Sequence, residues 1–514
     1  MEYSKDNLQE LIFMNMKTKI NIVLVVLPLL ISGGYPLFAA KPAVARKLSF
    51  DQALDITYQN SHVMKQVNFL REQKNQERLA AKGLFFPTIG VTASAVMMSD
   101  PITLDLTPVK DAITPLYKTL GSYGKFGDVP GLSDDVATQV IRQKLNTGLG
   151  EIQNEDWNQV IQKQQFAVLA ATLQWPVFTG GKILIANKAA EIQKKDVKDV
   201  FRQKEGELTS ELVERYYGLC LASSVVQVRH EVYDGIRKHL EDAQKLEIQG
   251  IISNADLLQA KVYDAQAGRE LSKALQNSEI VNRALTNTMA MDDSLQIEPV
   301  SALFYLDTIE PELYFHNLSV ARNPLLSQIE TKRQLSEQKF KAERAEFFPT
   351  IALQGSYDIV NKDLSSYLPD WEVGVGLKWT IFDGVSRFGK VKAASMQTKQ
   401  VEEYGIKAQD DVAMMVDKLY HDLNMYREQL TELETARQFS EELLRARDKE
   451  FHEEMTNSTQ VIDARLALAQ VKIERLQAMY NYDLTLARLL EYSGIPEDFL
   501  SYSKRNGVKS ENYQ

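Results

Sequence analysis

The sequence predicts a mixed α and β membrane protein built from one duplicated unit of helix, strand, strand and long helical hairpin. Three observations predict it: a Phe-Phe-Pro-Thr-Ile motif at 85–89 that recurs at 347–351, alternating segments after each copy, and two long stretches without proline. Proline cannot continue a helix and biases its neighbour toward extended angles, so each motif marks a change from helix to strand. A motif that recurs with its surroundings indicates an internal repeat.

The composition excludes some classes of protein before any motif is considered. The 514 residues are 44% hydrophobic and 25% charged, which is ordinary for a folded protein. The net charge of −10 provides no basic surface for a nucleic acid. The single cysteine, Cys220, cannot form an intramolecular disulfide. We therefore expect a folded protein without a nucleic-acid partner.

Residues 1–45 are predicted to form a secretory signal peptide. Two lysines precede an apolar run at 20–31, which is followed by small residues, the layout of an export signal. The run is shorter than the ~20 residues that a bilayer-spanning helix requires, so a membrane helix is the weaker interpretation. Cleavage after Ala40 or within 43–45 fits the pattern, and translation could begin at Met16 because the residues before it include several acids.

Four two-faced strands are predicted, two in each repeat. They span 88–97 and 166–178 in the first repeat, and 350–360 and 372–382 in the second. Alternation with a period of two gives a strand one apolar and one polar face. In the last strand the apolar face carries Val373, Val375, Leu377, Trp379 and Ile381. We expect this face to contact lipid, and the opposite face, from Glu372 to Lys378, to contact water.

The first repeat is longer than the second. Trp175 and Trp379 lie 204 positions apart, whereas the prolines of the two motifs lie 262 apart, so the first repeat has 58 additional residues between its strands. Residues 99–160 contain four prolines and several glycines. Because these residues interrupt regular structure, we expect a long loop there, with at most a short helix at 134–145.

Each repeat is predicted to end in a helical hairpin. No proline interrupts 183–249 or the second hairpin, and apolar residues between Val412 and Leu433 follow the spacing of a coiled-coil seam. Turn residues near 250–254 and 455–458 reverse the chain, which leaves rising helices of ~65 residues, ~100 Å long. The predicted domains are a first repeat at 46–299, a second repeat at 300–492 and a polar C-terminal tail at 493–514.

The strands have the length of membrane strands. They contain about 10–13 residues, close to the ~9–11 that cross a bilayer when tilted. Lipid does not tolerate open sheet edges, and four strands cannot close a useful barrel, so several chains must contribute. Three chains would supply twelve strands, an even number within the range of outer-membrane barrels. Aromatic residues lie at the helix-side ends of the strands, where a girdle at the membrane interface is expected. The alternative interpretation is that they belong to the core of a soluble protein. They are Phe85, Phe86, Trp175, Phe178, Phe347, Phe348, Trp379 and Phe382.

The ordered set of motifs over residues 48–492 resembles the TolC-like outer-membrane efflux proteins (outer membrane factors). It consists of the paired Phe-Phe-Pro-Thr motifs, Trp-Pro-Val-Phe-Thr-Gly-Gly at 175–181 and Trp-Thr-Ile-Phe-Asp-Gly at 379–384, each opening a long helix. The resemblance implies a homotrimer in the outer membrane of a Gram-negative-type cell, with a twelve-stranded β-barrel on a twelve-helix α-barrel that extends through the periplasm.

The same resemblance implies a function. It implies the exit duct of a tripartite efflux pump, joined by a periplasmic adaptor (a membrane fusion protein) to an inner-membrane transporter. The outer-membrane component of a type I protein secretion system is the alternative, and an exported coiled-coil scaffold is a weaker one. Neither the exported substrate nor the class of transporter follows from the motifs.

The turns of the two hairpins are the predicted functional sites. The adaptor is expected to contact Gly250, Ile251, Ile252, Ser253, Met455, Thr456 and Asn457. In the family, acidic residues after such turns line a closed periplasmic aperture. Asp256 and Asp463 match that pattern, whereas Gln460 stands where an aspartate is usual. Helix capping is the other explanation, because acids are favoured in the first turn of a helix.

No catalytic, cofactor or metal site is predicted. Gly180-Gly181-Lys182 lacks the first glycine of a phosphate loop and the Ser or Thr that would follow the lysine. His452 is followed by two glutamates but by no second histidine at the spacing of a zinc helix. We expect neither a cofactor nor enzymatic activity.

Overall fold

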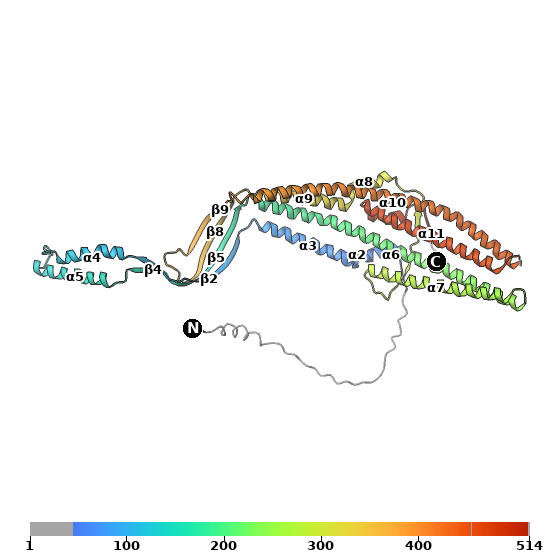
Figure 1. The fold of residues 1–514 in the computed structure, drawn as a ribbon, viewed down its shortest axis with the longest axis horizontal. Helices are drawn as coiled ribbons and strands as arrows, with labels where there is room; N and C mark the ends of the chain where they lie inside the picture. Colours follow the sequence, from blue (N-terminus) through green and yellow to red (C-terminus); the bar gives the residue numbers. More distant parts are fainter. Residues whose placement is uncertain (1–44, 454, 512–514) are drawn as a thin grey trace, which may run out of the picture. The chain divides into compact units, whose positions relative to one another are not determined.

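The computed structural model describes residues 45–453 and 455–511. The predicted signal peptide therefore lies outside the described residues, except for Ala45, at which the first strand begins. The described chain contains a four-stranded sheet, two long helical hairpins and two small two-stranded sheets among the helices (Figure 1).

The two hairpins contain most of the helical residues (Figure 1). Helices α6 and α7 form the first and α10 and α11 the second, with the bounds Lys182–Ile248, Asn254–Thr288, Ser386–His452 and Ser458–Tyr492. The rising helices have 67 residues each and the returning helices 35 each. All four bounds of the second hairpin lie 204 positions after those of the first, so the repeated sequence folds into a repeated structure. No helix within the described ranges is both long enough and apolar enough to cross a bilayer.

Each repeat begins with two shorter helices that meet at a capped break. Their bounds are Phe50–Asn60 and His62–Gly83 for α2 and α3, and Glu312–Arg322 and Pro324–Ala345 for α8 and α9. At the first break the Ser61 hydroxyl accepts hydrogen bonds from two backbone N–H groups of α3, and at the second the Asn323 side chain does the same for α9. These caps satisfy N–H groups that a new helix leaves without partners.

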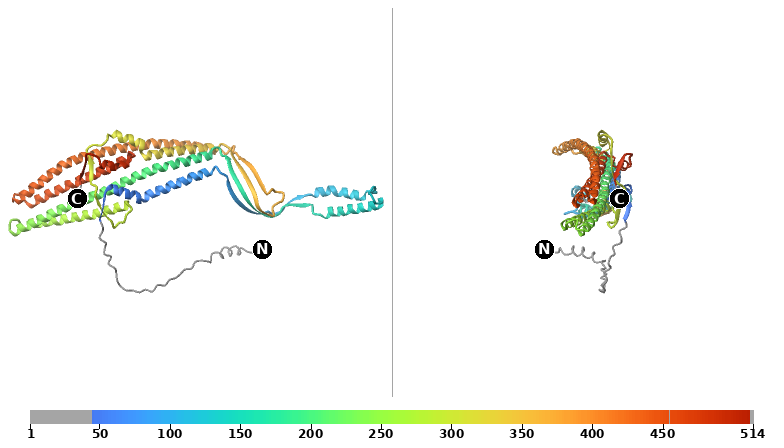
Figure 2. Two further views of the ribbon diagram at one scale, coloured as in Figure 1. Left: turned by 180° about the vertical axis from the view of Figure 1, so that it is seen from behind. Right: turned by 90° about the vertical axis from the view of Figure 1, so that its right-hand side faces the viewer.

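The helices pack side by side in two sections (Figure 2). In one section α3 packs on α6, α6 on α9, and α9 on α10. In the other section α7 packs on α6, α6 on α11, and α11 on α10. The long helices α6 and α10 belong to both sections, so they connect the strand end of the chain with the hairpin turns.

The four predicted strands form one antiparallel sheet with the order β2-β5-β8-β9. Their bounds are Thr88–Met97, Gln165–Phe178, Thr350–Lys362 and Trp371–Lys378. The prediction that the last strand continues to residue 382 was wrong. Its partner β8 begins at Thr350, which pairs with Lys378, so the chain beyond Lys378 has no neighbouring strand.

The segment 99–160 is not the long loop that its prolines indicated. It forms strand β3, helices α4 and α5, and strand β4, with the bounds Ile102–Asp105, Thr107–Ser122, Asp134–Asn154 and Asn158–Gln162. Strands β3 and β4 pair with each other, and α4 packs on α5. Pro101 precedes β3, Pro130 lies between the helices, and Pro108 lies in the first turn of α4, where a missing N–H costs nothing. Only Pro115 lies inside a helix.

The predicted polar C-terminal tail is also folded. It forms the short helices η1 and α12 and the strand β10, with the bounds Pro496–Asp498, Phe499–Ser503 and Val508–Glu511. β10 pairs with β7 (Leu303–Leu306), and β1 (Ala45–Leu48) pairs with β6 (Gln296–Pro299). The Phe499 ring is 1% exposed and lies 5.4 Å from Phe50 and 5.8 Å from Tyr217. The start of the described chain, the link between the repeats and the C-terminal segment therefore share one aromatic core with α6.

This core contains a buried carboxyl group. Asp483 on α11 is 0% exposed, and its Oδ2 accepts a hydrogen bond of 3.3 Å from the Phe304 N–H. Its other oxygen has no hydrogen-bond partner among the described residues. Burial raises the pKa of Asp483 well above its usual value, because removal from water disfavours the charged form. The nearby Cys220 is 3% exposed, and burial also raises the pKa of its thiol.

We expect Asp483→Asn to remove a pH dependence from the stability of this core. Above about pH 4 the unfolded chain has lost the Asp483 proton, whereas the folded chain keeps it up to its raised pKa. Stability should therefore fall across that window as the pH rises, by up to about 1.4 kcal/mol per pH unit. Asparagine still offers Phe304 an acceptor and has no proton to lose.

Thermal unfolding followed by circular dichroism at several pH values measures this dependence. Asp410→Asn, at an exposed position of α10, is the matched control. The same slope in the wild type and in Asp483→Asn would contradict the prediction.

Candidate functional site

The register of the four strands collects apolar side chains on one face of the sheet. Ile89 is paired with Leu173, Leu173 with Gly355, and Gly355 with Val373, so alternate positions of all four strands share a face. This apolar face carries Ile89, Val91, Ala171, Leu173, Leu353, Tyr357, Trp371, Val373, Val375 and Leu377. The opposite, polar face carries Thr88, Thr92, Thr172, Gln174, Gln354, Ser356, Asp358, Glu372 and Lys378. This separation is typical of membrane strands with one face in lipid and one in water.

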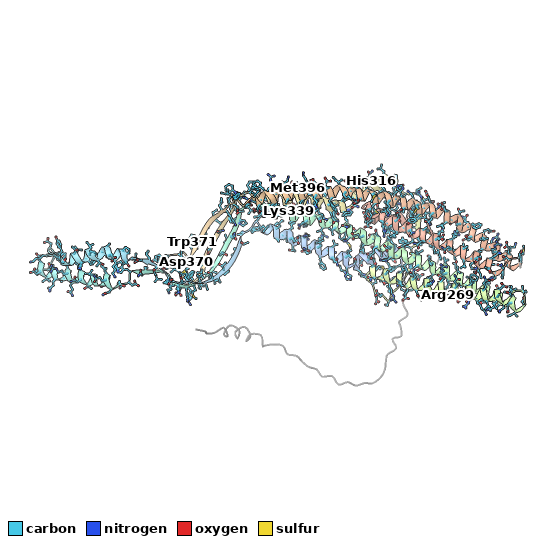
Figure 3. The ribbon with its side chains drawn as sticks, viewed as in Figure 1. Arg269, His316, Lys339, Asp370, Trp371 and Met396 are labelled. Carbon is cyan, nitrogen blue, oxygen red and sulfur yellow. The ribbon has the colours of Figure 1, made fainter. Side chains whose placement is uncertain are left out.

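The apolar face is exposed in the single chain and is bounded by aromatic residues. Val375 is 71% exposed, near the middle of β9. Trp371, labelled in Figure 3 beside Asp370, begins β9 and lies opposite Tyr357; both rings are more than half exposed. From Trp371 to Trp379 the chain is about 27 Å long at 3.4 Å per residue; tilted by ~40°, it rises about 21 Å along the membrane normal, close to the apolar band of ~25 Å. The sequence analysis found only the helix-side aromatics and missed Trp371 and Tyr357, whose pairing depends on the register.

The helix-side tryptophans are held in the same way in the two repeats. The Trp175 indole N–H donates to the Phe85 carbonyl at 2.9 Å, and the Trp379 indole N–H donates to the Phe347 carbonyl at 3.1 Å. Seven of the eight aromatics predicted for the interface are at least 42% exposed: Phe85, Phe86, Trp175, Phe178, Phe348, Trp379 and Phe382. Phe347 is half-buried, because its ring packs on Phe388 at 5.1 Å.

Arg387 fixes the junction between β9 and α10 and was missed in the sequence analysis. It is 8% exposed and donates to Asp383 Oδ2 at 3.0 Å and to the carbonyls of Glu346 and Ile381, each at 3.1 Å. Glu346 also forms an ion pair of 2.7 Å with Lys182, the first residue of α6. These contacts tie the two strand-to-helix junctions together. The four-residue spacing of Asp383 and Arg387 was the available sequence signal.

The turn of the first hairpin exposes an apolar end. Gly250 has a φ of +75°, a left-handed conformation that glycine adopts without strain. After it, Ile251 is 51% exposed and Ile252 is partly exposed, and Ser253 then caps α7. In the second turn Met455 is 74% exposed and Asn457 caps α11. Both turns therefore present aliphatic side chains to the surroundings of the single chain.

The two hairpin ends contact each other. The His239 ring on α6 lies 4.6 Å from the Phe451 ring on α10 and shares a hydrogen bond with the Ser458 hydroxyl. The Thr459 hydroxyl donates to Gln259 Oε1 at 3.4 Å, across α11 and α7. These contacts hold the two turns at one end of the helices.

Asp256 belongs to a helix cap in the single chain. Its Oδ2 accepts hydrogen bonds from the Ser253 N–H at 3.0 Å and from the Ser253 hydroxyl at 2.6 Å. These bonds lower the pKa of Asp256, the direction opposite to that of a carboxyl group crowded by other carboxylates. Asp463 is exposed on α11. The backbone N–H of Gln460 donates to Asn457 Oδ1 at 3.1 Å, so Gln460 belongs to the second cap.

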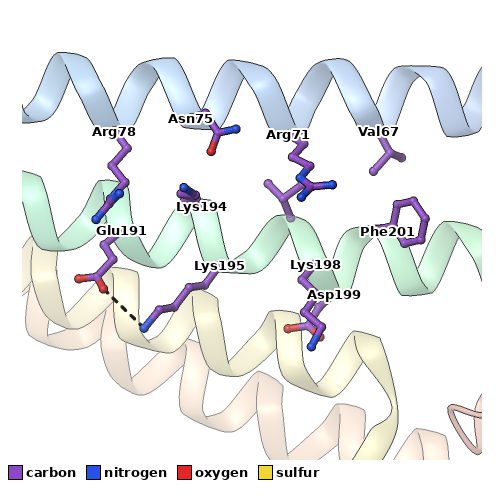
Figure 4. Close-up of a pocket in the computed structure, with 11 residues that line it drawn as sticks. Val67, Arg71, Asn75, Arg78, Glu191, Lys194, Lys195, Lys198, Asp199 and Phe201 are labelled. Carbon is purple, nitrogen blue, oxygen red and sulfur yellow. Dashed lines mark ion pairs between the residues drawn. The ribbon is translucent and has the colours of Figure 1, made fainter.

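A groove of about 890 Å³ lies between α3 and α6 (Figure 4). Its apolar lining is formed by Val67, Val197 and Phe201. Around them stand five cationic side chains, Arg71, Arg78, Lys194, Lys195 and Lys198, and two carboxylates, Glu191 and Asp199. Glu191 forms an ion pair of 3.6 Å with Lys195. Within the part of the chain that the structure describes, no group of three or more His, Cys, Asp or Glu side chains is placed to hold a metal ion.

Residues 316–494 match the sequence family described as "Outer membrane efflux protein". Several solved structures share the fold, and three of them are outer membrane proteins named here. The Campylobacter jejuni CmeC outer membrane channel is 12% identical, with a TM-score of 0.66, and the match covers 88% of this chain and 89% of the CmeC chain. For the Vibrio cholerae outer membrane protein VceC the identity is 13% and the TM-score 0.64, and the match covers 87% of this chain and 96% of VceC. For the Neisseria gonorrhoeae MtrE outer membrane channel in its open state the identity is 12% and the TM-score 0.64, and the match covers 87% of this chain and 89% of MtrE. No match was found among the curated proteins. The family match and the shared fold confirm the resemblance drawn from the motifs.

Proposed function

Residues 316–494 match the outer membrane efflux protein family, and we propose that three copies of this chain form the exit duct of a tripartite efflux pump. Their sheets close into a twelve-stranded barrel in the outer membrane, and their long helices form a twelve-helix barrel in the periplasm. A periplasmic adaptor joins this passive duct to an inner-membrane transporter, which selects the substrate.

The observation that carries the proposal is the exposed, two-faced sheet whose outer strands, β2 and β9, each have an edge unpaired within the described chain. In lipid an unpaired N–H or C=O group costs several kcal/mol, so these edges must be paired. β2 and β9 run in opposite directions, because three antiparallel pairings separate them, so β9 of one copy can pair with β2 of the next. Antiparallel pairing around the whole barrel is the arrangement of outer-membrane barrels.

The width that a duct needs sets a lower limit of three copies, which is the number that the resemblance to the family implies. One copy supplies four strands, which cannot close a barrel around a passage. Two copies would supply eight strands, and the interior of an eight-stranded barrel is filled by side chains. Three copies would supply twelve strands and leave a passage lined by the polar face. On that face of β9, Gly374 and Gly376 have no side chains that would narrow the passage.

Purification of the full chain from outer membranes tests the proposal. We expect a detergent-dependent particle with the mass of three copies, which conducts ions across a planar bilayer and copurifies with an adaptor and a transporter. A monomer that stays soluble without detergent would overturn it. The transporter that copurifies distinguishes efflux of small molecules from secretion of polypeptides.

We further propose that Asp256 and Asp463 line the periplasmic aperture, where three copies would supply six carboxylates. An acidic constriction favours cations and binds a blocking multivalent cation. Asp256→Asn with Asp463→Asn should therefore weaken cation selectivity and raise the blocking concentration roughly tenfold, which corresponds to about 1.4 kcal/mol. An asparagine in place of Asp256 still offers Ser253 an acceptor, so the cap and the fold should persist.

Single-channel recordings from the purified trimer measure both properties. Asp498→Asn, at the start of the C-terminal segment and far along the chain from both turns, is the control. Selectivity and block that are unchanged in the double variant would show that these aspartates serve only as helix-start residues.

A further inference from the structure

The α4–α5 hairpin has no role in the duct described above, and most of the aliphatic side chains of its first helix face away from its second helix. The side of α4 that packs on α5 carries Lys110, Thr114, Tyr117 and Gly121. The Lys110 Nζ donates to the Gln153 carbonyl at 3.0 Å, and a Cβ placed on Gly148 would lie 3.2 Å from the Tyr117 ring. On the α4 side, the contact between the two helices is thus made mainly by polar, aromatic and small residues.

Four of the five aliphatic residues of α4 form a separate stripe: Val109, Ala112, Leu116 and Leu120. The fifth, Ile113, is partly buried and lies between this stripe and the side that packs on α5. At 100° per residue this stripe is turned about 120° from the side that packs on α5. Val109 is 48% exposed, Leu116 57% and Leu120 39%, and no residue of α4 is buried. A continuous exposed aliphatic stripe of this kind marks a surface that another molecule covers.

The base of the hairpin is fixed to the sheet of its own chain. Gln162 is 7% exposed, its Nε2 donates to the Asp363 carbonyl at 2.9 Å, and its Oε1 accepts from the Ser365 N–H at 2.8 Å. Lys163 adds an ion pair of 2.6 Å with Asp363. Since 363–370 form the turn between β8 and β9, the hairpin is anchored at the strand ends away from the long helices (Figure 1).

We infer that each α4 stripe packs against the hairpin of the neighbouring copy, so that six helices form a collar around the outer mouth of the duct. This inference rests on the proposed assembly of three copies. Twelve strands spaced ~4.8 Å apart and tilted by ~40° give a rim of about 75 Å. Three hairpins, each two helices of ~10 Å across, occupy about 60 Å of that rim. Adjacent hairpins are thereby brought side by side.

The neighbouring hairpin offers a matching surface. On α5, Val136 is 45% exposed and Val140 is 40% exposed, four residues apart on one side of the helix. The alternative occupant is a lipid surface, for which an amphipathic helix needs a polar face rich in lysine and arginine. α4 has only Lys110 and Lys118, and Lys110 is bound to α5. A second copy of this chain is therefore the better partner.

Spin labelling of the full-length trimer in detergent tests the collar. Nitroxide labels are placed at Ala112→Cys, within the stripe, and at Lys118→Cys, two residues from Leu116 and outside the stripe. The native Cys220 is 3% exposed, and the unsubstituted parent shows whether it takes up label. We expect the label at 112 to be about fivefold less accessible than that at 118 to a water-soluble nickel chelate, and to be poorly accessible to oxygen as well.

Adding Leu116→Lys and Leu120→Lys should raise the accessibility at 112 to that at 118, because the stripe can then no longer pack. High oxygen with low nickel accessibility at 112 would place the stripe in detergent or lipid and overturn the inference. A label at 112 as accessible as that at 118 in an intact trimer would also overturn it. The size of the particle, measured before labelling, separates these outcomes from a failure of the proposed trimer itself.

Discussion

Val375→Arg is expected to destabilise the assembled barrel by about 2–4 kcal/mol, the cost of an arginine on the lipid face near the bilayer midplane. Val375 lies halfway between Trp371 and Trp379 and is 71% exposed on the apolar face. Leu377 lies closer to Trp379 and hence to the membrane interface, so Leu377→Arg should cost only about 0–1 kcal/mol more than Lys378→Arg. The effect should therefore depend on depth as well as on face.

The matched control is Gly374→Arg, one residue before Val375 on the opposite face. A Cβ at Gly374 would meet no described atom within 4 Å, so the substitution fits sterically and points away from lipid. Unfolding from lipid vesicles in urea, or the fraction of trimer that resists heating in detergent, measures the difference. Equal losses at positions 374 and 375 would show that the sheet does not have one face in lipid.

Replacing Ile251 and Ile252 by aspartate is expected to abolish transport and to weaken adaptor binding at least about tenfold while the trimer assembles normally. Ile251 is 51% exposed and follows the left-handed Gly250, so it takes no part in the core of the chain. In a complex these side chains would be covered by the adaptor, and a charge buried without a partner costs several kcal/mol. The loss should therefore appear in binding and not in folding.

Affinity purification with a co-expressed adaptor measures this binding, and the particle size measures assembly. Gln244→Asp, at an exposed position on α6 shortly before the turn, adds the same kind of charge outside the apolar end. Dissociation of the trimer by the isoleucine changes would mean that these residues are structural. Unaltered binding would mean that the adaptor contacts the duct elsewhere.

The sequence by itself determined the elements whose causes are local. Proline at 87 and 349 ends a helix, alternation with a period of two makes a strand, and stretches without proline make the long helices. The offset of 204 positions placed the second hairpin on the first before any coordinates were known, and α6 and α10 do have equal lengths. The alternation in the sequence also indicated the apolar face of β9 up to Lys378. The pleat of a strand places alternate residues on opposite faces, whatever strands lie beside it.

Only the tertiary structure decided what depends on residues far apart in the chain. Phe499 lies in a polar stretch, yet its ring is buried by Phe50 and Tyr217, which no local pattern reveals. At the end of the sheet away from the long helices, two aromatic side chains lie together because the register sets Tyr357 opposite Trp371. In 99–160 the prolines proved compatible with helices, and the stripe of α4 is unpartnered within the described chain because α5 packs on a different side. Periodicity tells which residues share a face of an element, but only long-range packing decides what that face meets.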